Sequence, residues 1–80
     1  MSCYVATFHT HLAALTTARA LSSRGVSAKM MPTPRKLSSS CGTCLRYEAE
    51  DPCLSDMDAD MEQVCTLEAE ERYIVLVKNA

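Results

Sequence analysis

The first half of the chain alternates between the periods of strands and of a helix. Residues 3–8 are apolar, β-branched and aromatic, which is typical of a short strand. Residues 11–24 carry apolar side chains at helical spacing; Thr10 precedes them as an expected N-cap, and Gly25 follows as an expected stop. Residues 26–31 alternate with the two-residue period of a half-buried strand, which the prolines that follow should end.

The second half of the chain predicts a strand, a helix and a final strand. Residues 43–47 alternate as a strand does. A second helix is expected near residues 57–67, because a capping-box-like start at Ser55 precedes a stripe made of Met57, Met61, Val64 and Leu67. Residues 72–78 form the strongest apolar run and are the expected last strand.

This order of elements predicts one α+β domain that spans residues 1–80. The pattern β-α-β-β-α-β is ferredoxin-like, with a four-stranded antiparallel sheet and two helices on one face. In that topology the third strand lies between the first and the second. His9 and His11, which follow the first strand, should then lie near the loop between the second and third strands.

Composition favours a small cytoplasmic protein. The chain has 80 residues, of which 48% are hydrophobic, and this is enough for one small core. It shows no secretory signal and no apolar run of the ~20 residues that cross a membrane, so we expect a cytoplasmic protein with no membrane partner. Five cysteines are an odd number, and in a reducing compartment they are expected to stay unpaired.

Charge is divided unequally along the chain. Residues 1–46 contain six cations and no acids, whereas residues 47–80 contain ten acids and two cations. The acidic half would repel phosphate, so nucleic acid is not an expected partner. The acids are expected to form a solvated helix face.

The loop at residues 32–44 concentrates reactive and anion-binding residue types. Its cations favour the thiolate form of a nearby cysteine, and thiolates are the nucleophilic form. Hydroxyl and amide groups of such a loop can hold an anion, and glycine allows close approach. We therefore predict Cys41 and Cys44 as reactive thiols, His9 and His11 as proton acceptors, and an anion site formed by Arg35, Lys36, Ser38, Ser39, Ser40 and Gly42.

Other interpretations of the same residues remain open. Cys41 is also explained as a small buried apolar residue in an ordinary serine loop. Cys41 and Cys44 match the C-x-x-C of dithiol oxidoreductases, although an extended strand separates such residues too far for a disulfide. The histidines and cysteines have the residue types of a zinc site, but one C-x-x-C with one H-x-H is weak support, and neither a metal nor a cofactor is predicted.

The chain also resembles the small bacterial proteins described as putative selenium/sulfur-carrier-like. The resemblance rests on the first strand leading into a helix, and on the order Pro32, Pro34, Arg35, three serines, Cys41 and Gly42. It implies that Cys41 takes the carrier position, with Arg35 and Ser38 to Ser40 around it. Cys44 departs from the family pattern, in which an apolar residue is usual.

Three functions follow as hypotheses. The first is a carrier that holds reduced sulfur or selenium on Cys41, between a donor protein and an acceptor protein. The second is a thiol-disulfide protein that uses Cys41 and Cys44. The third is a non-catalytic module that binds an anion or a partner; sheets of this kind also form homodimers through an exposed edge. No glycine-rich phosphate loop or nucleophile elbow is present, so the sequence names no enzymatic reaction.

Overall fold

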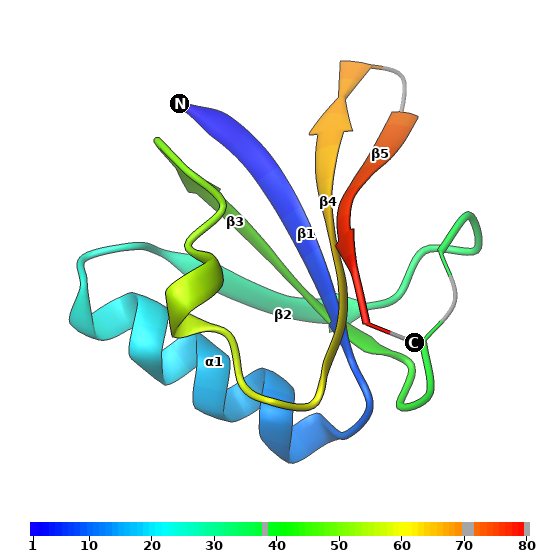
Figure 1. Ribbon diagram of the computed structural model, residues 1–80, viewed down its shortest axis with the longest axis horizontal. Coiled ribbons are helices and arrows are strands. Elements are labelled where there is room, and N and C mark those ends of the chain that lie inside the picture. The colour runs from blue at the N-terminus through cyan, green and yellow to red at the C-terminus, as the bar shows by residue number, and fades with distance from the viewer. Residues whose placement is uncertain (38, 70–71, 80) are drawn as a thin grey trace.

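The computed structural model describes residues 1–37, 39–69 and 72–79 (Figure 1). In these residues one α-helix and five strands are joined by turns, loops and a short 3-10 helix before the fourth strand. The elements are β1 (Ser2–Phe8), α1 (His11–Ser23), β2 (Ala28–Pro32), β3 (Thr43–Ala49), η1 (Leu54–Asp56), β4 (Met61–Glu68) and β5 (Arg72–Lys78).

The five strands form a single sheet in the order β2-β3-β1-β4-β5. Every neighbouring pair is antiparallel, and β1 lies at the centre between β3 and β4. Helix α1 packs against β2, β3 and β1 on one face of the sheet (Figure 1). Strands β2 and β5 form the two edges of the sheet.

The prediction of a two-helix, four-stranded ferredoxin-like fold is wrong. Residues predicted as the second helix form β4 instead, and β5 adds a fifth strand beside it. The predicted apolar stripe from Met57 to Leu67 has helical spacing, but it was misleading. Gln63 and Cys65 lie between its members and are buried too. A strand covered on both faces shows no clean period, so the pattern fits either element.

The acidic segment before β4 forms a turn rather than a helix start. The Asp60 amide donates to the Asp58 side chain at 3.0 Å, and the Asp58 amide donates to Thr17 Oγ1 of α1 at 3.0 Å. An aspartate that bonds the backbone two residues on closes a turn and leads into extended chain. Only η1, of three residues, is helical there.

The first half of the chain follows the sequence closely. Helix α1 begins after Thr10, whose hydroxyl accepts from the Ala13 amide at 3.0 Å, and the chain leaves the helix at Gly25 with a φ of 81°. The position of β3 between β1 and β2 is also as expected. This arrangement brings the end of β1 to the loop between β2 and β3.

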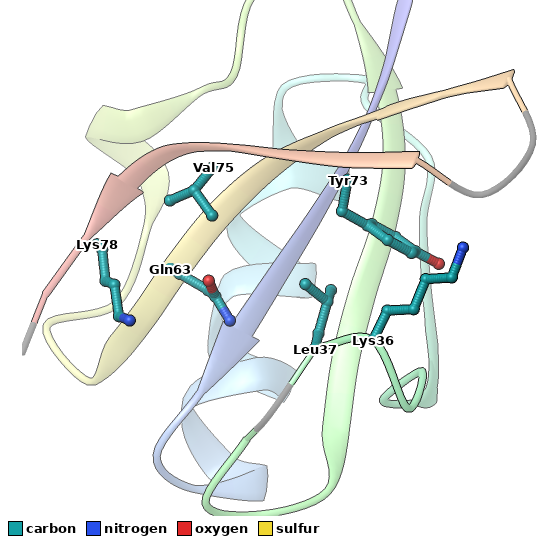
Figure 2. Close-up of a pocket in the computed structure, with 6 residues that line it drawn as sticks. All are labelled: Lys36, Leu37, Gln63, Tyr73, Val75 and Lys78. Carbon is teal, nitrogen blue, oxygen red and sulfur yellow. The ribbon is translucent and has the colours of Figure 1, made fainter.

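The core lies between α1 and the sheet. Its fully buried members include Phe8, Ala14, Leu21, Leu45 and Val64. On the opposite face of the sheet, Thr7, Cys44 and Cys65 are equally buried. There the segment that carries Lys36 and Leu37 lines a pocket together with side chains of β4 and β5 (Figure 2).

Candidate functional site

The loop between β2 and β3 is held at both ends by backbone hydrogen bonds. The Thr33 amide donates to the Gly42 carbonyl at 3.0 Å, which extends the strand pair by one step. The Leu37 amide donates to the Pro34 carbonyl at 3.0 Å, so Arg35 and Lys36 are the two central residues of a tight turn. Gly42 has a φ of 73°, a conformation that favours glycine.

Cys41 is half-buried at the point where this loop meets the end of β1. Its sulfur lies 3.3 Å from the Phe8 carbonyl oxygen, 3.6 Å from the Thr43 carbonyl oxygen and 3.9 Å from Ser39 Oγ. Carbonyl oxygens accept a hydrogen bond from a thiol and repel a thiolate. To react as a nucleophile, the sulfur must therefore leave these carbonyl oxygens.

The serines beside Cys41 fasten the loop to two different strands. Ser39 Oγ donates to the same Phe8 carbonyl at 3.0 Å. Ser40 bonds to Glu62 of β4: its amide lies 3.2 Å from each carboxylate oxygen, and its hydroxyl donates at 2.7 Å. These contacts place the two residues before Cys41 in a fixed position.

Both predicted histidines lie at this loop. His9 Nδ1 is 3.3 Å from the Glu62 carboxylate and 3.4 Å from Ser40 Oγ, and His11 Nδ1 is 3.5 Å from Thr43 Oγ1. Within the described part of the chain, neither ring is a hydrogen-bond partner of the Cys41 sulfur. Their proximity to the loop follows from the topology, while their role in moving protons remains a prediction.

Glu62 completes the site and was missed by sequence reasoning. Burial raises the pKa of its carboxyl group, but the hydrogen bonds from Ser40, together with the nearby Ser39 hydroxyl and His9, outweigh this, and the net pKa is lowered. The sequence offers no local signal for this residue, because it belongs to the segment predicted as a helix. Only the pairing of β4 with β1 brings it to the loop.

The other cysteines have different environments. Cys44 is fully buried in β3, its thiol donates to the Pro32 carbonyl at 3.7 Å, and burial raises its pKa. Burial likewise raises the pKa of Cys53 and of Cys65. All five cysteines are unpaired, and Cys3 is the other one that is half-buried rather than buried.

The predicted anion site is only partly assembled. Ser39, Ser40 and Gly42 lie beside Cys41, Arg35 is exposed in the turn, and Ser38 lies outside the described residues. Lys36 lines a pocket with Gln63 and Tyr73 on the sheet face opposite α1 (Figure 2).

Neither a metal-binding cluster nor a membrane-spanning helix is found in the described ranges. No three histidine, cysteine or acidic side chains there come together as a metal site would require. No helix in those ranges is long and apolar enough to cross a membrane.

These features define a small α+β protein with a half-buried cysteine in a tethered loop. A family model described as "Putative Se/S carrier protein-like" matches residues 3–55, which is more than half of the chain, and the protein belongs to this family. The match runs from within β1 into η1 and includes the whole Cys41 loop, but ends before Glu62. No curated protein and no solved structure matches the chain.

Proposed function

We propose that this protein carries a reduced sulfur or selenium atom on Cys41 and delivers it to another protein. The observation that carries the proposal is the difference among the thiols. Cys44, Cys53 and Cys65 are buried and their pKa values are raised, whereas Cys41 is half-buried in a loop whose ends are fixed. Family membership independently supports a carrier function.

Loading requires the Cys41 thiol to lose its proton and move off the Phe8 carbonyl. The resulting thiolate attacks the outer sulfur of a donor persulfide, a new S–S bond forms at Cys41, and the donor's S–S bond breaks. The donor leaves as a thiolate, which takes up a proton. Atoms and electrons balance without a cofactor, and an acceptor thiol removes the sulfur by the same exchange.

The surrounding residues have distinct roles in this proposal. Ser39 and Ser40 position the loop. The Glu62 carboxylate holds Ser40 by accepting hydrogen bonds from the amide and the hydroxyl of Ser40. His9 shares that carboxylate and contacts Ser40, the residue before Cys41, so it is the candidate to exchange a proton with the leaving donor. Arg35 is exposed in the turn and is the candidate partner for an anionic adduct.

The test is sulfur loading followed by intact mass measurement. The reduced protein is incubated with a low-molecular-weight persulfide, and the mass gain of one sulfur atom is located by peptide mapping. We expect loading at Cys41 that Cys41→Ser abolishes, while Cys3→Ser, which removes the other half-buried thiol, leaves it unchanged. Equal loading of Cys41→Ser and the unaltered protein would overturn the proposal.

A further inference from the structure

A second candidate site lies on the sheet face opposite α1. A pocket of about 310 Å³ opens there between the Pro34–Leu37 turn and the strands β4 and β5. Six residues line it: Lys36, Leu37, Gln63, Tyr73, Val75 and Lys78. In Figure 2, Lys36 and Tyr73 stand at one end of the pocket and Lys78 at the other, with Leu37 and Gln63 between them. Cys41 does not line this pocket.

The polar groups of the lining are predominantly hydrogen-bond donors. Lys36 and Lys78 carry ammonium groups, and the hydroxyl of Tyr73 can donate as well. Gln63 is buried, and its carbonyl oxygen lies 3.8 Å from the Cys65 sulfur and accepts from that thiol. This contact orients the amide nitrogen of Gln63 toward the pocket (Figure 2).

The six lining residues include no carboxylate. Glu62, which precedes Gln63 in the chain, directs its carboxylate to Ser40 and His9 instead. The lining therefore carries two positive charges in a small space, and such a space favours an anion. Lys36, Gln63 and Tyr73 also interact within the protein, so a ligand would share or replace those interactions.

The middle of the pocket is less polar than its ends. Leu37 and Val75 contribute aliphatic side chains there, and Tyr73 contributes its ring. A charged group at each end and an apolar middle are the complement of an organic dianion. We propose that this pocket binds a short organic dianion, with one anionic group at Lys36 and the other at Lys78. The inference goes beyond the carrier function and does not depend on it.

The proposal is tested by titrating the isotopically labelled protein with a set of linear probes and following amide chemical shifts. The dicarboxylates from succinate to suberate are compared with hexanoate, which has one charge, and with 1,6-hexanediol, which has none. Low ionic strength is used because salt screens exposed charges. We expect saturable shifts at Gln63, Val75 and Lys78 with a dicarboxylate, about tenfold weaker binding of hexanoate, and none of the diol.

Variants assign the two ends of the pocket. Lys36→Gln and Lys78→Gln should each weaken dicarboxylate binding about tenfold, to the level of hexanoate. Lys78→Arg should retain binding, and Lys29→Gln, on the exposed face of the opposite edge strand, is the matched control. Equal binding of hexanoate and the dicarboxylates, or full binding by either lysine-to-glutamine variant, would overturn the proposal.

The same titration in Cys41→Ser separates the two proposals. Binding that persists in this variant, together with failure of sulfur loading at Cys41, would remove the carrier function and leave the dianion site intact. Sulfur loading at Cys41 without dicarboxylate binding would remove the dianion site and leave the carrier function intact. Dispersed amide spectra of every variant establish that a lost signal reflects binding and not unfolding.

Discussion

Glu62 accepts hydrogen bonds from both the amide and the hydroxyl of Ser40, although 22 positions separate the two residues. Ser40 directly precedes Cys41, so a carboxylate on β4 fixes the backbone beside the candidate thiol. The same carboxylate contacts His9 at the end of β1. One side chain thus connects the loop, the central strand and its neighbour, and it does so from outside the segment that the family model matches.

Removing the charge of Glu62 should loosen the Cys41 loop. Glu62→Gln keeps the shape of the side chain, but it weakens charge-assisted bonds to Ser40 that are worth about 1.5–3 kcal/mol each. A loss of about 1 kcal/mol raises the population of open loop roughly fivefold. We expect Cys41 to react with iodoacetamide faster by about that factor, measured by mass spectrometry in a Cys3→Ser background.

The matched control for this experiment is Glu68→Gln, which removes a carboxylate from the exposed end of the same strand. Its alkylation rate at Cys41 should equal that of the background protein. If the two glutamine variants react at the same rate, Glu62 does not restrain the loop.

The sequence predicted the elements whose signals are local. Thr10 caps α1 through a side-chain oxygen three residues from its donor, and Gly25 ends the helix through its own backbone conformation. The contact between His9 and the loop was also predictable, because it requires only that β3 lies beside β1.

The prediction for the second half of the chain was wrong because its apolar pattern fits both a helix and a strand. Met61 and Val64 fit a helical stripe, but Gln63 and Cys65 are buried as well, since β4 lies inside the sheet with both faces covered. Assigning β4 to a helix concealed the role of Glu62, whose partners come from β1 and the loop. Long-range strand pairing overrode the local capping signal at Ser55.

Cys41 and Cys44 should not behave as a redox couple in the folded protein. Cys44 is fully buried, burial raises its pKa, and its thiol donates to Pro32. Mild oxidation under native conditions should leave the two thiols without a mutual disulfide, whereas oxidation in denaturant should link them. Peptide mapping by mass spectrometry measures both, and faster linkage in the native protein would restore the redox hypothesis.

Two buried threonines should respond oppositely to the same substitution. Among the described residues, the buried hydroxyl of Thr7 has no hydrogen-bond partner, whereas Thr17 Oγ1 accepts from the Asp58 amide. An unsatisfied buried hydroxyl costs about 1–3 kcal/mol, so Thr7→Val should raise the free energy of unfolding by about 1 kcal/mol. Thr17→Val should lower it by a similar amount. Urea unfolding measures both, and a loss of stability in Thr7→Val would contradict the assignment.

A side chain at Gly42 should find enough space, but the backbone conformation there should be strained for any residue other than glycine. A Cβ built there meets no atom within 4 Å, yet its φ is 73°. Gly42→Ala should therefore cost about 1 kcal/mol of unfolding free energy, from the left-handed backbone alone. Gly42→Asn should cost less, because asparagine enters this region more readily. Equal losses in the two variants, measured by urea unfolding, would point to a steric origin instead.

Acid should weaken the contribution of Glu62 to stability. Its folded pKa is lowered from the ordinary value of 4.5, despite the opposing effect of burial, by the bonds from Ser40 and by the nearby Ser39 hydroxyl and His9. A carboxyl group with a depressed folded pKa stabilises the protein fully above its unfolded pKa, and that stabilisation is lost as the pH falls through the folded value. The difference in unfolding free energy between the unaltered protein and Glu62→Gln should therefore persist down to about pH 5 and then shrink on further acidification. Urea unfolding at each pH measures this difference. A difference that stays constant down to the acid unfolding of the protein would mean that the Glu62 carboxylate is not bonded to the loop in solution.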